Sequence, residues 1–158
     1  MRLIELLTQE RVVIRHNEDG ERSIDKAGVL HVLAQALATG ARVDAAQVER
    51  VLSERERLQS TGIGEGVAIP HGALAQLQTQ YAALLIVPEG VDFAAIDAMK
   101  VTILFAVIGP KRATGEHLKT LARVSRLLRN KGFRDRLVAA PDANEAYALI
   151  VAEEGQRQ

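Results

Sequence analysis

Two continuous apolar segments set the strongest limit on how this chain can fold. They cover Tyr81–Val87 and Val101–Ile108, and each has the length of a single strand. A strand with one buried face alternates apolar and polar residues, whereas an uninterrupted apolar run is typical of a central strand that is covered on both faces. We therefore expect these two segments to form central strands of a sheet.

Helical patterns alternate with these strand patterns along the chain. Apolar residues recur at helical spacing before Gly40, which is placed to end that helix. Asp44 and Gln47 have the spacing of a capping box and open a helix that is expected to end near Glu56 or Arg57. Alternating helices and buried strands predict the α/β class, with a central mixed β-sheet flanked by helices. Residues 1–158 are expected to form a single domain.

The region around the second apolar segment carries two further local predictions. Pro88–Gly90 is predicted to be a turn between the two strands. Thr114 is predicted to cap a helix that runs from about Gly115 to Arg129. The inward stripe of that helix is expected to consist of Leu118, Leu121, Ala122, Ser125 and Leu128.

The composition excludes several classes of function. Lys plus Arg and Asp plus Glu both number 20, so the net charge is zero and the basic footprint of a nucleic-acid binder is missing. The chain has no Cys, which excludes a disulfide, a thiol nucleophile and a Cys-ligated zinc. No apolar run approaches the ~18 residues of a membrane span, and no histidine pair has metal-site spacing. We expect a cytoplasmic protein with no metal, no cofactor, no nucleic-acid partner and no direct membrane insertion.

His71 is the strongest candidate for a reactive side chain. It follows Ile69-Pro70 at the expected end of a short strand, it precedes Gly72, and the glycine-rich segment Ser60–Gly66 lies just upstream. Backbone N–H groups of such a loop can form an anion-binding concavity, and a neutral imidazole is a competent nucleophile near neutral pH. This combination points to phosphoryl transfer through histidine, and the alternative is a histidine packed in a corner between strand and loop. The glycine spacing matches neither a Walker loop nor the dinucleotide fingerprint.

Three more charged or titratable residues are candidates to bind a phosphoryl group. His117 falls near the third position of the helix after Thr114, where the helix dipole favours a neutral ring and a nearby anion. Arg55 and Arg57 end the helix before the glycine-rich segment, and the guanidinium group suits phosphate. Taken alone, His117 could equally be a surface histidine of the first helical turn. The two arginines alternate with Glu54 and Glu56, and such charged runs are usually a solvated helix end.

Three segments of the chain resemble one known family. Ser60–Gly72 resembles the phosphohistidine motif, Gly90–Asp97 the stretch before the second long strand, and His117–Arg123 the helix of the second active-site histidine. The family is enzyme IIA of the fructose/mannitol class of the bacterial phosphoenolpyruvate–sugar phosphotransferase system, which includes the nitrogen-regulatory enzyme IIA proteins. The resemblance covers about residues 44–151 and implies the phosphotransferase enzyme IIA type-2 fold.

The resemblance also implies a role for individual residues. It identifies His71 as the histidine that is transiently phosphorylated on Nε2, with the phosphoryl group arriving from Nδ1 of a histidine on an HPr-like phosphocarrier protein. It identifies His117 as the second histidine, which helps to hold the phosphoryl group, and Arg55 as the active-site arginine, whereas Arg57 does not match that position. The protein would be a phosphotransferase component whose further partners are a IIB component or regulatory target proteins. The expected phosphate-binding loop consists of Ser60, Thr61, Gly62 and Gly72.

Two positions depart from the family pattern, and three roles stay open. Ala73 stands where Lys or Arg is common, which is expected to alter partner choice, and Thr102 stands where Asp is frequent. A nitrogen-regulatory role is favoured, because the chain carries no HPr, IIB, IIC or membrane segment of its own. A free-standing sugar-specific IIA that passes phosphate to a IIB component is the first alternative. A regulatory binding module that no longer transfers phosphate is the second, and a metal- or nucleotide-dependent hydrolase lacks every usual motif.

Overall fold

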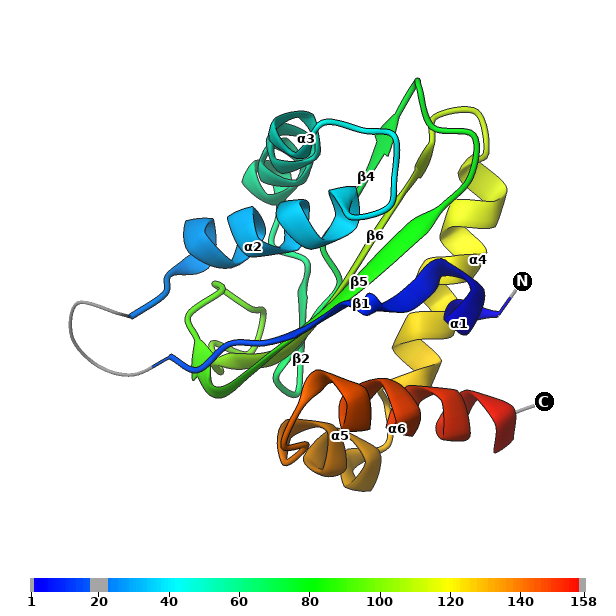
Figure 1. Cartoon of the computed structure of the whole chain (residues 1–158). Helices are drawn as coiled ribbons and strands as arrows, with labels where there is room; N and C mark the ends of the chain where they lie inside the picture. Colours follow the sequence, from blue (N-terminus) through cyan, green and yellow to red (C-terminus); the bar gives the residue numbers. More distant parts are fainter. Residues whose placement is uncertain (1, 18–22, 157–158) are drawn as a thin grey trace.

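The computed structural model describes residues 2–17 and 23–156 (Figure 1). A mixed sheet runs through the middle of the molecule, and helices pack on both of its faces. This arrangement confirms the predicted α/β class. In chain order the elements are α1 Leu3–Leu6, β1 Leu7–Ile14, α2 Lys26–Ala38, α3 Ala45–Leu58, β2 Gly62–Gly64, β3 Val67–Ala68, β4 His71–Leu74, β5 Tyr81–Val91, β6 Val101–Pro110, α4 Thr114–Leu127, α5 Lys131–Val138 and α6 Ala143–Gln156.

The two apolar segments lie at the centre of the sheet, as predicted. They form β5 and β6, which pair in antiparallel fashion with Tyr81 opposite Ile108. β1 lies parallel beside β5, while β3 and β4 both lie parallel beside β6. β2 pairs antiparallel with β3 at the far edge, so the sheet order is β1-β5-β6-β3-β2 with β4 also on β6.

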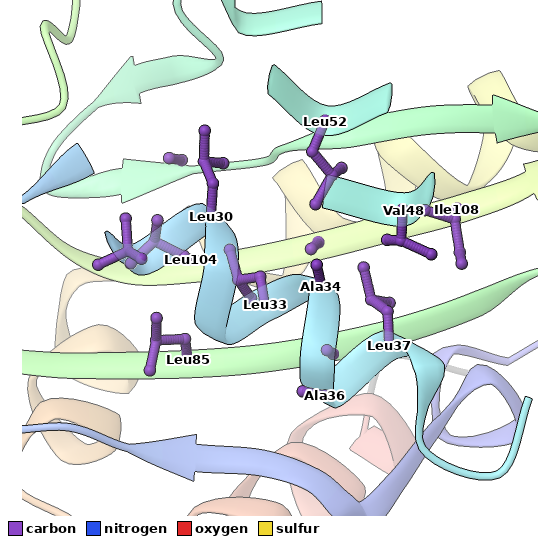
Figure 2. Close-up of a cluster of buried hydrophobic side chains, with 14 of the residues drawn as sticks. Leu30, Leu33, Ala34, Ala36, Leu37, Val48, Leu52, Leu85, Leu104 and Ile108 are labelled. Carbon is purple, nitrogen blue, oxygen red and sulfur yellow. The ribbon is translucent and has the colours of Figure 1, made fainter. Parts of the chain in front are cut away.

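Alternate side chains of the central strands enter two separate apolar cores. Leu85 and Leu104 belong to the core formed with α2 and α3, whereas Leu84 and Phe105 belong to the core formed with α1, α4, α5 and α6. Figure 2 shows the first core, in which side chains of α2 and α3 lie over β5 and β6. Each fully buried Leu or Phe contributes roughly 1.5–3 kcal/mol of transfer free energy. Because both faces are covered, both faces of the strands must be apolar, which explains the uninterrupted segments.

The first two long helices end and begin close to where the sequence predicts. Gly40 follows α2 with a φ of +74°, a conformation that glycine adopts readily at a helix end. Asp44 caps α3 by accepting a hydrogen bond from the backbone N–H of Ala46 at 3.3 Å. Gln47 does not complete a capping box, because its side-chain oxygen accepts a hydrogen bond from Gln76 at 2.6 Å.

The predicted turn at Pro88–Gly90 is wrong. β5 continues through these residues to Val91, and its pairing with β6 shifts register between Ile86 and Val91. Proline lacks the N–H group that a regular ladder requires, and irregular pairing accommodates it. Gly90 has a φ of +82°, which glycine adopts without steric cost. The strand therefore bends here instead of ending.

The inward face of α4 is also different from the predicted stripe. The N-cap residue is Ala113, so Thr114 is the first helical residue and not the cap. Leu118 is 61% exposed, and the residues that α4 buries are Thr120, Val124 and Leu127. Of the other predicted stripe residues, Leu128 is buried, Leu121 and Ser125 are partly buried, and Ala122 is exposed.

Candidate functional site

Pro70 separates two short strands that lie end to end along β6. β3 ends at Ala68 and β4 begins at His71, which lies opposite Val107 of β6. The proline has no N–H group to donate, but its carbonyl oxygen accepts the backbone N–H of Val107 at 3.0 Å. His71 therefore begins a strand, whereas the sequence predicts it at the end of one. The pairing with β6 fixes the backbone on which the imidazole is carried.

One hydrogen bond determines which nitrogen of His71 can react. The Nδ1 atom lies 2.8 Å from the carbonyl oxygen of Ile69. A carbonyl oxygen can only accept, so Nδ1 carries the proton and donates it. In the neutral ring the lone pair is then on Nε2, which is the nucleophilic nitrogen.

The surroundings of His71 favour the neutral ring. Burial lowers the pKa of His71 below its usual value of 6.5, and the positive charge of Arg55 lowers it further. The hydrogen bond to Ile69 and the negative charge of Glu56 act in the opposite direction without reversing the shift. At neutral pH the ring is therefore uncharged and able to act as a nucleophile.

The ring of His117 lies beside the ring of His71. The two ring centroids are 5.6 Å apart and the ring planes are inclined by 54°. His117 is the fourth residue of α4, one later than predicted, and its backbone N–H is bonded to Ala113 at 3.1 Å. Burial lowers the pKa of His117, and the neighbouring His71 lowers it further. The structure thus brings together two histidines that are 46 residues apart in the sequence and that both favour the neutral form.

A close contact between α3 and β4 brings the charge of Arg55 near His71. A Cβ atom added to Gly72 would come within 2.2 Å of Cγ1 of Val51, so α3 can approach β4 this closely only because residue 72 is glycine. Arg55 lies one turn after Val51 on α3, and its charge acts on His71. Its Nη1 atom donates to the carbonyl oxygen of Gln59 at 2.8 Å, which leaves the other guanidinium donors for a ligand.

Arg57 lies on a different side of α3. Its side chain is exposed and lines a surface hollow together with Glu54 and Arg50. Arg55, and not Arg57, is therefore the arginine whose charge acts on His71.

The residues of the predicted phosphate-binding loop have partners within the protein. The N–H group of Thr61 donates to Glu56 at 3.0 Å, and the N–H group of Gly62 donates to the hydroxyl oxygen of Ser60 at 3.1 Å. That hydroxyl group in turn donates to the carbonyl oxygen of Phe93 at 2.8 Å. Ser60 and Thr61 precede the β2–β3 hairpin, Gly62 begins it, and Gly72 lies in β4. The role of these residues in phosphate binding stays a prediction, which requires the N–H groups of Thr61 and Gly62 to exchange partners.

Glu56 is a buried carboxylate beside the site that the sequence analysis did not select. Its side chain pairs with Lys26 of α2 at 2.9 Å and accepts hydrogen bonds from both the backbone N–H and the hydroxyl group of Thr61. The carbonyl oxygen of Thr61 accepts the N–H of Ile69 at 3.0 Å, and the carbonyl of Ile69 holds His71. A continuous chain of hydrogen bonds thus connects α2, α3 and the hairpin to the ring of His71.

A signal for Glu56 is present in the sequence. Val48 and Leu52 are both buried on α3, and Glu56 follows them at the same spacing of four residues. Helical periodicity therefore places this acid on the buried face, and a buried carboxylate requires partners. The adjacent charged residues make the segment resemble a solvated helix end and hide this signal.

The structure of residues 2–17 and 23–156 bears on two other classes of site. No group of three or more His, Cys, Asp or Glu side chains there could hold a metal ion. Within the same residues no helix combines the length and the apolar character that crossing a membrane requires.

Comparisons with known proteins bear on the family and the fold of the chain. Residues 6–153 match the model of the family described as "Phosphoenolpyruvate-dependent sugar phosphotransferase system, EIIA 2". The chain is 37% identical over 152 residues to a nitrogen regulatory protein of Pseudomonas aeruginosa, with 96% of each chain covered. The crystal structure of nitrogen regulatory protein IIA-Ntr from Neisseria meningitidis has a TM-score of 0.82 and 32% identity, covering 92% of this chain and 97% of that one. Mannitol enzyme IIA of Escherichia coli, solved in complex with phosphorylated enzyme IIB, has the same fold, with a TM-score of 0.73 and 18% identity over 93% of this chain and 99% of that chain.

Proposed function

The chain belongs to the EIIA 2 family of the phosphoenolpyruvate-dependent sugar phosphotransferase system, and on this basis we propose that His71 accepts a phosphoryl group on Nε2 from an HPr-like phosphocarrier. The observation that carries this proposal is the hydrogen bond from Nδ1 of His71 to Ile69. That bond holds the proton on Nδ1 and leaves the Nε2 lone pair free to attack phosphorus.

The reaction needs positioning more than proton transfer. The Nε2 lone pair of His71 forms a new P–N bond while the P–N bond to the donor histidine breaks, and the bonding electrons return to the donor ring nitrogen. No proton has to move in this exchange, because the proton of His71 stays on Nδ1. Catalysis then comes from alignment and from donors around the three phosphoryl oxygens. We assign these donors to Arg55, whose charge acts on His71, and to His117, whose ring lies next to that of His71.

A nitrogen-regulatory role is the one that the comparisons favour. The relative in Pseudomonas aeruginosa is named a nitrogen regulatory protein, and it matches over 96% of both chains. In this role the phosphorylation state of His71 changes which regulatory proteins the site surface can bind.

Transfer to a IIB component is the second candidate. It is favoured by the fold shared with mannitol enzyme IIA, which was solved with phosphorylated enzyme IIB. In that role the phosphoryl group leaves Nε2 of His71 by the reverse of the same in-line exchange.

Phosphoryl transfer from phosphoenolpyruvate tests the proposal directly. The protein is incubated with phosphoenolpyruvate, enzyme I and HPr, or with their nitrogen-branch counterparts, and the label is tested for acid lability and base stability. We expect one phosphoryl group on the wild type and none on His71→Ala. His31→Ala is the matched control, because His31 lies on α2 and pairs with Glu49 at 2.6 Å, and it should label normally. An unlabelled wild type contradicts the proposal and leaves the non-transferring binding module. A fully labelled His71→Ala contradicts the assignment of His71 as the acceptor.

A further inference from the structure

Two buried polar atoms at the site have no hydrogen-bond partner within the described part of the chain. They are Oε1 of Gln80 and Nδ1 of His117. Gln80 is only 5% exposed, so its amide oxygen cannot be satisfied by bulk water. A buried polar group without a partner costs about 1–3 kcal/mol, and such groups in a native fold call for an explanation.

Both side chains lie against the same glycine. A Cβ atom on Gly109 would lie 3.0 Å from Cγ of Gln80 and 3.3 Å from Nδ1 of His117. Gln80 directly precedes β5, whose first residue, Tyr81, pairs with Ile108 next to Gly109. The missing side chain at Gly109 thus leaves one space on β6 that the side-chain stem of Gln80 and the imidazole of His117 both border.

We propose that Gln80 is a positioning residue for His117 in the phosphorylated protein: its carbonyl oxygen accepts a hydrogen bond from Nδ1–H of His117, so that Nε2–H of His117 donates to the phosphoryl group on His71. This inference rests on the proposed function. It assigns a partner to each of the two unpartnered atoms by a rotation of the amide. A hollow of about 220 Å³ beside Gln80 provides space for that rotation.

The charges around His117 explain why an acceptor is needed only after phosphorylation. In the free protein burial and His71 lower the pKa of His117, so its ring is neutral and holds one proton. A phosphoryl group brings nearly two negative charges beside it, which favours uptake of a second proton from solvent. The ring then has two N–H donors, and the one at Gly109 requires an acceptor.

The other charged groups near this contact do not supply that acceptor. Glu116, Lys119 and Arg123 line the hollow together with Gln80, and Arg55 acts on the side of His71. Two of the three charged residues that line the hollow are cations, which oppose a second charge on the ring. A neutral amide oxygen can accept the hydrogen bond inside the protein at a smaller desolvation cost than a carboxylate.

Histidine titrations by NMR, with and without phosphorylation of His71, test this contact. The variants are Gln80→Met, which keeps the length but removes the amide, and Gln80→Glu, which offers a charged acceptor. In the phosphorylated protein we expect Gln80→Met to lower the pKa of His117 by about one unit, which is the tenfold effect of one hydrogen bond to a charged group. The rate at which the phosphoryl group is lost should rise about tenfold as well. Gln80→Glu should raise the pKa of His117 in both states.

The outcomes separate this inference from the proposed function. If wild type and Gln80→Met are both phosphorylated and their His117 titrations and phosphoryl lifetimes agree, the positioning role is contradicted while the proposed function stands. If the wild type takes no label, the proposed function fails. The contact between Gln80 and His117 is overturned separately if the pKa of His117 is unchanged in unphosphorylated Gln80→Glu. Met has nearly the same volume as Gln, so we expect Gln80→Met to keep the native fold. Spectra of both variants check that they are folded.

Discussion

At the scale of single residues, the reactivity that we propose for His71 depends on one carbonyl group and one cation. The carbonyl of Ile69 holds the proton on Nδ1 at 2.8 Å, which leaves Nε2 as the nucleophile. The charge of Arg55 helps to keep the ring neutral, and the same guanidinium group is available to an incoming phosphoryl group. The two requirements of acceptance, a neutral ring and a stabilised anion, thus share one side chain.

Replacing Arg55 tests both parts of this role. We expect Arg55→Gln to raise the pKa of His71, because the cation that lowers it is removed. The same variant should slow phosphorylation about a hundredfold, because it loses a hydrogen-bond donor to the phosphoryl oxygens. NMR titration of the histidines and the initial rate of labelling measure the two effects. Arg57→Gln, on the exposed side of the same helix, is the control and should leave both unchanged. Equal rates for the two variants would contradict the assignment.

The sequence predicts the identity of these residues better than their chemistry. The motif from Ser60 to Gly72 and the position of His117 are sufficient to select His71, His117 and Arg55 as candidates. The proton position on His71 depends on how the chain bends around Pro70, which no local pattern encodes. Gln80 carries no motif at all, and only the space at Gly109 reveals its relation to His117.

At the scale of elements, the site depends on how closely α3 approaches β4. A side chain at Gly72 would overlap Val51, so this glycine determines the distance between the helix and the strand. Because Arg55 lies one turn further along α3, the same distance determines how near its charge is to His71. Helical periodicity predicts α3 itself, but not a contact between two elements.

Adding one methyl group at Gly72 tests this spacing. We expect Gly72→Ala to reduce the free energy of unfolding by about 1–3 kcal/mol, the usual cost of overpacking, and to slow phosphorylation because Arg55 moves away. Urea unfolding and labelling rates measure both, and the double variant Gly72→Ala, Val51→Ala should recover part of each loss. Gly155→Ala, on α6 with open space around it, is the control and should not destabilise the protein. A single Gly72→Ala variant as stable and as fast as the wild type would refute the close-approach argument.

The prediction of which residues α4 turns inward is wrong for a physical reason. Counting apolar residues selects Leu118 and its neighbours, yet the helix buries Thr120 and turns His117 toward His71. Thr120 can be buried because its hydroxyl group donates to the carbonyl oxygen of Glu116 at 3.1 Å. Functional helices often break the apolar pattern, so a pattern-based prediction fails first at such a site.

At the scale of the whole molecule, Glu56 connects parts of the chain that are distant in sequence. It joins Lys26 at the start of α2 to Thr61 in the hairpin, and through Ile69 this network reaches His71. The apolar cores on the two faces of the sheet hold the layers together, whereas this network holds the reactive corner. Lys26 and Glu56 are far apart in the sequence, so their pairing could not be predicted from the spacing of residues.

Neutralising Glu56 tests the network. We expect Glu56→Gln to reduce the free energy of unfolding by about 2 kcal/mol, because Lys26 loses its counter-charge while the hydrogen bonds of Thr61 are weakened. Glu54→Gln on the exposed side of α3 is the matched control and should lie within about 0.5 kcal/mol of the wild type. Urea denaturation measures both, and similar stabilities for the two variants would show that the network does not stabilise the fold.

The two histidines also predict how stability depends on pH. Their pKa values in the folded protein lie below the value of about 6.5 in the unfolded chain, so the unfolded chain binds more protons between these values. The free energy of unfolding should be unaffected by these histidines above about pH 6.5, and it should decrease as the pH falls through this window. Urea unfolding across the window measures the slope, which the double variant His71→Gln, His117→Gln should reduce. An equal slope in that variant would mean that other groups cause the dependence.

The position of the phosphoryl group tests the central claim most directly. Protein labelled at the histidine ring nitrogens is phosphorylated from phosphoenolpyruvate, and NMR coupling between phosphorus and nitrogen identifies the modified atom. We predict a single phosphoryl group on Nε2 of His71, with the Nδ1 proton still donated to Ile69. A phosphoryl group on Nδ1 of His71, or on His117 instead, would contradict the account.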